Sequence, residues 1–287
     1  HCARLPDAPA NLLLLRVWTH VIVSVPFHQI LCCKQCSQGL DWTTAQVAAA
    51  LRKFTPVSTS RPSPQAFLDA YEAAASAGAD AVVSVHISSD MSGTVESAAL
   101  AASQSPIPVE VVDSRSMGMA MGYAVLSAAM AAREGLDAKA VAAVARSRAG
   151  AATVIFYVDT LEYLRRGGRI GVASALLGSA LAIKPLLALS DGHIAAIEKV
   201  RTSVRALSRL EELALKAADA AGESGVDIAV HHLDSKARAI DLVERLRARV
   251  ASTTTVVLVE LGAVVGAHVG PGTIAVAVSP RPFVGQH

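Results

Sequence analysis

The chain has 287 residues, of which 52% are apolar and 17% charged, so it can bury a large core and is not intrinsically disordered. Its formal net charge of +2 and the absence of a long Lys/Arg run argue against a nucleic-acid-binding protein. The length allows one large or two ordinary domains.

The first quarter of the chain predicts few regular elements. We expect a strand at 17–25, a helix at 43–54 capped by Asp41 or Thr43, and a second helix at 65–78. The cysteines near the start contain one C-x-x-C spacing without a second pair. This is weak evidence for zinc, and free thiols in a reducing cytoplasm are the simpler interpretation. The sequence leaves open the role of Cys32, Cys33 and Cys36.

Three apolar stretches could be mistaken for membrane or export segments. The one at 116–132 is rich in Gly, Ala and Met and follows a strand, which indicates a buried helix. The one at 173–189 is interrupted by Lys184 and Pro185, which a membrane span would not favour. The one at 11–25 has no basic leader, so we interpret it as part of the fold rather than a signal peptide.

From residue 81 onward, apolar runs alternate with helical segments. The predicted strands are 81–87, 109–112 and 153–158, and the predicted helices are one that begins near Gly93, one at 116–133 and one at 137–147. This alternation favours a mostly parallel α/β/α sheet covered on both faces. Ligands of such sheets usually bind beyond the carboxyl ends of the strands.

The second half has the pattern of an α+β domain. Short helices interrupted by Gly167 and Gly168 precede a hairpin that turns at Asp191-Gly192. After these we expect helices at 203–221 and 235–250, strands at 226–233, 254–260 and 273–279, and a glycine-rich loop before the last strand. We therefore predict two domains, 1–158 and 159–287.

Hydroxyl side chains cluster where the strand at 81–87 ends. Ser88, Ser89, Ser92 and Thr94, together with Gly93, stand at the start of a helix. A helix N-terminus has unpaired N–H groups and a partial positive charge, so it can bind an anion. The alternative is that Ser92 only caps the helix. A cap needs one hydroxyl, however, and this loop supplies four.

Two more polar loops accompany this cluster. One is the stretch 58–63, and the other is 266–272, where glycines surround His268. A histidine can bind or release charge near neutral pH, although a structural role in a turn is equally compatible with the sequence. Nucleophile-elbow, phosphate-binding-loop, dinucleotide and zinc-protease motifs are all absent from the sequence.

Six stretches in order form a specific set of motifs: TSRPSP, HISSDMSGTVESA, VVDSRSMGMAMG, DTLEYLRRGGRIGVASALLGSALAIKPLL, DGHIAAIEKVR and AHVGPGTIAVAV. This set resembles the motifs of the DegV family of fatty-acid-binding proteins. The resemblance covers about residue 40 to the end. It implies two α/β domains with a fatty acid in an apolar tunnel between them. The low-aromatic stretch 173–187, rich in Ala, Leu and Ile, could line that tunnel or belong to the ordinary core.

The resemblance also implies which residues bind the fatty-acid carboxylate. Position by position, these are Thr59, Ser60, Ser92, Gly93, Thr94 and His268. Arg201 matches an arginine associated with a partner kinase and phosphoryl transfer. The family usually has Gly in place of Asp90, so we expect this carboxylate to face solvent or to form an ion pair. The family's first strand is represented only by HCARLP, which indicates a truncated first strand.

The function implied is that of a lipid carrier. Such a protein binds a long-chain fatty acid and presents it to a separate ATP-dependent fatty acid kinase, which forms acyl phosphate. We expect no catalytic residue, metal or cofactor in the chain, and we expect a cytoplasmic monomer. The alternative is a stand-alone hydrolase or phosphotransferase, with Ser92 as nucleophile and His268 as base.

Overall fold

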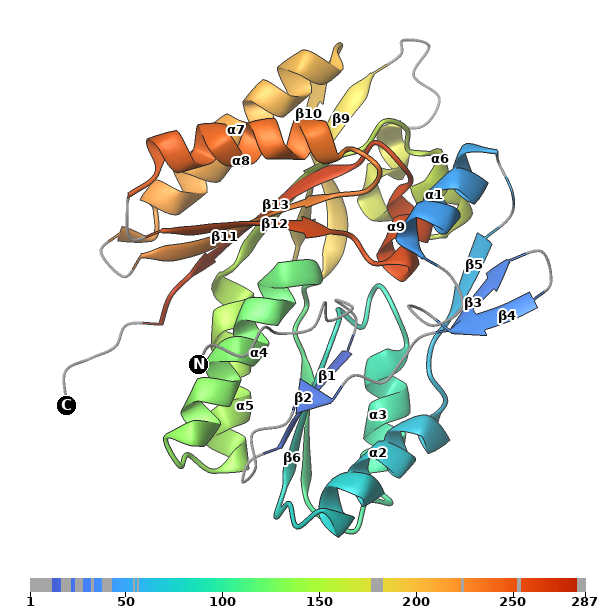
Figure 1. Ribbon diagram of the computed structural model, residues 1–287, viewed down its shortest axis with the longest axis vertical. Helices are drawn as coiled ribbons and strands as arrows, with labels where there is room; N and C mark the ends of the chain where they lie inside the picture. Colours follow the sequence, from blue (N-terminus) through green and yellow to red (C-terminus); the bar gives the residue numbers. More distant parts are fainter. Residues whose placement is uncertain are drawn as a thin grey trace.

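The computed structural model describes residues 12–16, 22–23, 28–31, 34–37, 43–53, 55, 57–176, 183–222, 225–251 and 254–282. The strands in these ranges form sheets of four, six and three strands (Figure 1). Most of the strand predicted at 17–25 lies outside the described residues, as do Asp41, Cys32, Cys33 and residues 177–182 of the predicted tunnel stretch 173–187.

The four-stranded sheet has the order β2-β1-β6-β7. Its strands are β1 (Leu12–Arg16), β2 (Ile22–Val23), β6 (Val82–His86) and β7 (Val109–Asp113). Only β6 and β7 pair in parallel, whereas β1 pairs antiparallel with both β2 and β6, so the predicted mostly parallel sheet is wrong here. The truncation of the family's first strand stays a prediction, and β1 pairs with β6 along its whole length. Pairing with β1 gives hydrogen-bond partners to backbone N–H and C=O groups of the buried strand β6. Without partners, such buried groups would cost free energy of folding.

The six-stranded sheet has the order β10-β9-β8-β13-β11-β12. Its strands are β8 (Thr153–Tyr157), β9 (Lys184–Ser190), β10 (His193–Val200), β11 (Val226–His232), β12 (Thr255–Glu260) and β13 (Ile274–Pro280). Strand β8 was predicted with the first half of the chain, yet it pairs antiparallel with β9 and β13. An apolar run has the same pattern in either sheet, so the sequence could not assign it. The boundary at residue 159 stays a prediction.

The two large sheets alternate with three layers of helices, which makes five layers in all. The helices are α2 (Pro64–Ser76), α3 (Thr94–Ala102), α4 (Gly118–Arg133), α5 (Ala138–Ala151), α7 (Ser203–Asp219) and α8 (Lys236–Arg249). Helices α2 and α3 pack on the outer side of the four-stranded sheet, and α7 and α8 cover the outer face of the six-stranded sheet. Helices α4 and α5 contact both sheets and form the middle layer (Figure 1).

A small region beside these layers joins early and late parts of the chain. It contains the strands β3 (His28–Leu31), β4 (Lys34–Ser37) and β5 (Val57–Ser60) and the helices α1 (Thr44–Arg52), α6 (Glu162–Arg166), η1 (Gly171–Leu176) and α9 (Ala263–Val269). Helix α9 contacts α1, α6 and β5. Two predicted loops are therefore partly regular: Ser58–Ser60 belong to β5, and residues 266–269 belong to α9. Burial of α9 overrides the low helix propensity of its glycine.

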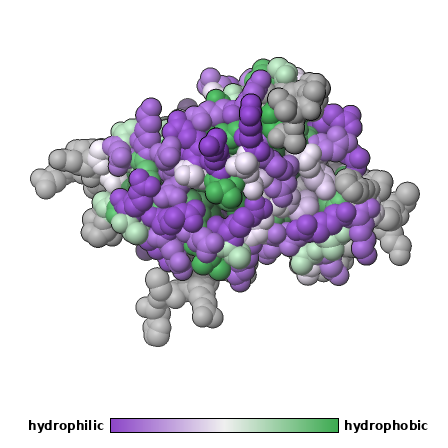
Figure 2. All heavy atoms as spheres, turned by 90° about the horizontal axis from the view of Figure 1, so that it is seen from above, coloured by the Kyte–Doolittle hydropathy of each residue, from purple (hydrophilic) through white to green (hydrophobic). Residues whose placement is uncertain are grey.

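The apolarity of the helices bears on whether one could span a membrane, and the described ranges contain no candidate membrane-spanning helix. None of the helices there combines the length and the apolarity that crossing a bilayer requires. The apolar stretch at 116–132 forms the buried helix α4, as predicted. Seen from above, the molecule is mostly polar, and apolar side chains show in small separate groups (Figure 2).

Candidate functional site

A cavity of about 260 Å³ lies where the end of β5, the loop after β6, helix α9 and the start of β10 meet. One part of its lining is polar: Thr59, Ser60, Arg61, Ser92, Gly93, Arg169 and His268. The other part is apolar: Ile87, Met91, Met117, Leu164, Ile194, Val264, Val265 and Val269. The polar residues, called the polar wall below, offer donors for a head group, and the apolar residues, called the apolar walls, offer contacts for a hydrocarbon.

Two segments that are 209 positions apart in sequence meet at His268. Its Nε2 atom lies 2.8 Å from the Thr59 Oγ1 atom, whereas its buried Nδ1 atom has no hydrogen-bond partner among the described residues. Burial, with a smaller contribution from the Arg169 cation, lowers the pKa of His268 from 6.5 to about 4. The imidazole is therefore neutral at pH 7. Gly167 permits this placement, because a Cβ there would lie 2.3 Å from the Nδ1 atom.

The hydroxyl cluster stands at the N-terminus of α3. Gly93 is the N-cap residue, and no side chain caps the helix, so the interpretation of Ser92 as a cap is wrong. The Ser92 hydroxyl makes no hydrogen bond to another described residue. The Thr94 Oγ1 atom is fully buried and also lacks a partner in this part of the chain. This end of α3 therefore keeps hydroxyl and amide groups available for an anion.

Two arginines line the cavity that the sequence reasoning did not assign to the site. Arg169 donates from Nε to the Met91 carbonyl oxygen at 3.1 Å and from Nη1 to the Gly167 carbonyl oxygen at 2.5 Å. It forms no ion pair with a described carboxylate, so its charge remains available. Arg61 is half exposed and lies 3.3 Å from both the Gly93 carbonyl oxygen and a Glu96 carboxylate oxygen.

The signal that could have identified these arginines was chemical. A buried carboxylate needs a nearby cation or several donors, and Arg61 and Arg169 both lie inside the resembling motifs. The described residues contain no group of three or more His, Cys, Asp or Glu side chains that could hold a metal ion.

The structure brings most of the predicted site residues together. Thr59, Ser60, Ser92, Gly93 and His268 line the one cavity, and Thr94 follows Gly93 at the start of α3. Two predicted parts of the site lie elsewhere. Arg201 is exposed beyond the end of β10 and does not line the cavity, and neither does any described residue of the stretch 173–187.

Asp90 does not point its charge at the site. Its Oδ2 atom lies 3.0 Å from the His193 Nδ1 atom, and its side chain is 38% exposed. The expectation that this carboxylate would face solvent or pair is confirmed, because it does both.

Comparison with known proteins identifies the family of this chain. The family model described as an uncharacterised protein of the DegV family matches residues 18–281. The chain belongs to the DegV family. A DegV domain-containing protein of Streptomyces coelicolor is 47% identical over 281 residues, which are 98% of this chain and 99% of that protein. A DegV domain-containing protein of Mycobacterium bovis is 34% identical and covers 90% of this chain and 89% of its own length.

Solved DegV structures have the same fold. A fatty-acid-binding DegV family protein from Thermus thermophilus superimposes with a TM-score of 0.82 at 32% identity, covering 89% of this chain and 91% of its own. DegV from Bacillus subtilis, described as a fatty-acid-binding protein, gives a TM-score of 0.80 at 28% identity, with 90% and 91% covered. The mixed α/β fold that the sequence indicated is therefore that of the DegV structures.

Proposed function

We propose that this protein binds a long-chain fatty acid. The carboxylate would occupy the polar wall of the cavity, and the acyl chain would lie against the apolar walls and continue into the core. The observation that carries this proposal is the gathering of hydroxyls, helix-end amides, a neutral histidine and two arginines in the lining of one cavity that is otherwise apolar. Solved DegV proteins from Thermus thermophilus and Bacillus subtilis, described as fatty-acid binding, support it.

The free energies of burying an acyl chain and a carboxylate are compatible with the residues that line the cavity. About 14 buried methylenes at roughly 0.8 kcal/mol each provide about 11 kcal/mol of gross transfer free energy. A buried carboxylate is costly unless several donors bind it. Ser92, the first amides of α3 and Arg169 supply such donors. When His268 Nε2–H donates to Thr59, the Thr59 hydroxyl proton is also free to bind a carboxylate oxygen.

We further propose that the bound carboxylate is presented to a separate ATP-dependent fatty acid kinase, which forms acyl phosphate. The half-exposed Arg61 marks a side of the cavity that a partner could reach. Arg201 would contact the partner rather than the ligand, which agrees with its exposed position away from the cavity.

The alternative is an enzyme that uses Ser92 and His268. A serine nucleophile is activated by a base within hydrogen-bonding reach. The Nε2 atom of His268 is instead bonded to Thr59, and the Ser92 hydroxyl has no bond to a described residue. This geometry favours the carrier.

Native mass spectrometry of the purified protein, followed by denaturing extraction, tests the proposal. We expect a stoichiometric co-purified acid of about 14 to 18 carbons, the chain length that the methylene estimate assumes. A control sample is incubated with an acyl ester, and we expect no turnover. An empty protein that neither takes up palmitate nor retains it would refute the carrier, and ester hydrolysis abolished by Ser92→Ala would establish the enzyme.

A further inference from the structure

We infer that Asp90 and His193 are positioning residues that control how fast the cavity releases its ligand. They join the turn of the β9–β10 hairpin to the loop at residues 88–93, which carries the head-group donors of the proposed site. The inference rests on the proposed function for the identity of the ligand, but the contact itself can be tested without any ligand.

Three contacts seat the hairpin turn on the carboxyl ends of β6 and β7. The Ser88 hydroxyl donates to the Gly192 carbonyl oxygen at 2.9 Å, and the Asp90 Oδ2 and His193 Nδ1 atoms lie 3.0 Å apart. Arg115 donates from Nη2 to the carbonyl oxygen of Asp191. A Cβ on Gly192 would lie 2.5 Å from the Ser88 Oγ atom and 2.8 Å from Asp90 Oδ2. The turn and the loop therefore fit closely, and only glycine fits at that point.

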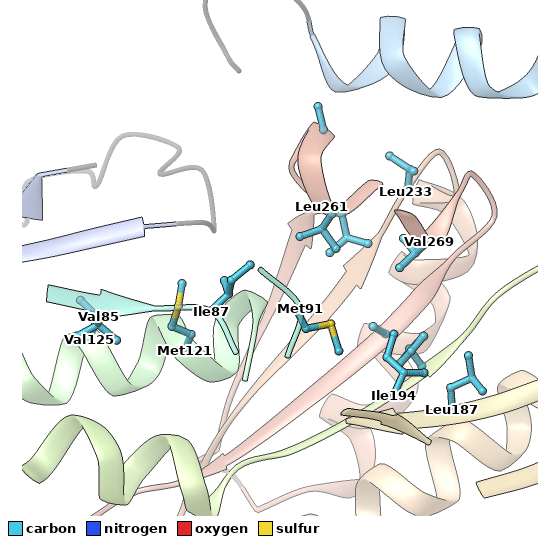
Figure 3. Close-up of a cluster of buried hydrophobic side chains, with 14 of the residues drawn as sticks. Val85, Ile87, Met91, Met121, Val125, Leu187, Ile194, Leu233, Leu261 and Val269 are labelled. Atoms are coloured by element: carbon cyan, nitrogen blue, oxygen red, sulfur yellow. The ribbon is translucent and has the colours of Figure 1, made fainter. Parts of the chain in front are cut away.

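The residues that follow Asp90 and His193 in sequence both line the cavity. Met91 follows Asp90, and Ile194 follows His193. Figure 3 shows the Met91 side chain directed toward Ile194, so the hairpin and the loop close this side of the cavity together. Separation of the pair would move these two apolar walls apart.

The same loop carries the donors of the polar wall. The backbone N–H groups of Met91 and Ser92 both donate to the Ser88 carbonyl oxygen, at 2.9 and 3.1 Å. Arg169 binds the Met91 carbonyl oxygen from the other side. The loop is thus held between the hairpin and Arg169, and its release from the hairpin would displace Ser92 and Gly93 from the head group.

The exposure of the pair indicates a kinetic role rather than a role in folding. The side chains of His193 and Asp90 are 53% and 38% exposed. Exposed ion pairs contribute little to global stability. A contact of this kind can still determine how often a loop beside a cavity opens. Local opening occurs where the local free energy of unfolding is lowest, so one weak contact can change its frequency.

The experiment uses Asp90→Ala, His193→Ala and the double variant. Each protein is loaded with cis-parinaric acid, a fluorescent C18 acid, and release into excess phosphatidylcholine vesicles is timed. We expect both single variants to release the probe about twofold to fivefold faster, the range that the loss of one exposed side-chain contact allows. The double variant should be no faster than the singles, because the two residues act as one contact.

The control is Glu198→Ala. Glu198 lies on the same strand, β10, and forms an ion pair with Arg209 of α7 at 2.7 Å, but it does not line the cavity. Its release rate should equal that of the wild type. Unchanged rates in the Asp90 and His193 variants, additive effects in the double variant, or an equal acceleration in the control would each overturn the inference.

A second measurement separates this inference from the proposed function. Amide hydrogen exchange of Met91 and Ser92 in ligand-free protein should be faster in Asp90→Ala and His193→Ala than in Glu198→Ala. If the wild type binds no fatty acid, the proposed function fails, and the exchange rates still decide whether the contact holds the loop. Equal exchange in all three variants would reject the contact.

Discussion

The molecule has two buried polar regions that join distant parts of the chain, and they differ in how their arginine charges are paired. In the first region, Arg148 of α5 forms an ion pair with Asp227 of β11 and donates to Ser127 at 2.6 Å and to Ser279 at 3.1 Å. Asp227 also binds Arg281 at 2.7 Å. Burial alone would raise the pKa of Asp227, but hydrogen bonds from Arg281 and Arg148 hold it below its usual value.

The second region is the polar wall of the cavity, where some groups have unused hydrogen-bonding capacity. His268 Nδ1 and Thr94 Oγ1 are buried without a partner among the described residues, but so is the Tyr123 hydroxyl beside Arg148, so the two regions differ in how their arginine charges are paired. Arg169 binds only carbonyl oxygens there. Buried polar groups are normally bonded, so unbonded ones need an explanation. The comparison indicates that the Arg148 network stabilises the fold, whereas the cavity wall is prepared for a ligand.

The strongest way to test this contrast is to break the network. Asp227→Asn keeps the shape of the side chain but leaves the Arg148 charge, only 7% exposed, without its carboxylate. We expect the free energy of unfolding to fall by about 3 kcal/mol, because an uncompensated buried charge is costly. Urea denaturation measures this, with Glu198→Gln as the exposed-pair control. A loss no greater than that of the control would place the network among weak surface pairs.

The opposite result is expected at the cavity wall. Ser92→Ala removes a hydroxyl that bonds to no described residue, so stability should change by no more than about 0.5 kcal/mol. Retention of palmitate should weaken about tenfold, the loss of one hydrogen bond to a charged group. Denaturation curves and equilibrium dialysis on the same preparation give both values. If the variant loses stability but not affinity, Ser92 belongs with the structural network.

A smaller effect concerns pH. The folded-state pKa of His268, about 4, lies below its unfolded value, so the unfolded chain binds more protons between pH 6.5 and 4. The stability from this residue is present above pH 6.5 and is lost as pH falls through that window. Full linkage at pH 5 would be about 2 kcal/mol, and we expect about 1 kcal/mol because the ring is only partly buried.

The measurement compares wild type with His268→Gln, which cannot titrate. Urea denaturation at pH 7 and pH 5 should show a smaller loss in the variant. His86 and His231 are also buried with lowered pKa values, about 3 and about 4, and they contribute equally to both proteins. Equal losses in wild type and variant would show that His268 is charged or exposed in the folded protein.

The sequence predicted those parts of the fold that depend on local pattern. The hairpin at Asp191-Gly192 is confirmed, and both residues have the positive φ angles that a tight turn requires, +48° and +85°. The helix cap at Thr43 is also confirmed, and Asp137, where the sequence predicted a helix to begin, caps α5. Turn and cap residues act on their immediate neighbours, so a single sequence carries this information.

The parts that failed depend on distant partners. Strand β8 has the apolar pattern of a buried strand, but nothing in its residues specifies which sheet it joins. The predicted loop around His268 is partly helical because α9 is buried against α1 and α6. At the site, the hydroxyls were identified by their clustering, whereas Arg169 is held by carbonyl groups that have no sequence signature.

Helices α4 and α5 have a consequence for how the chain can be divided. Since each contributes side chains to the cores of both large sheets, they belong equally to either half. A truncation that removes one sheet would strip an apolar face from these helices and expose it to water.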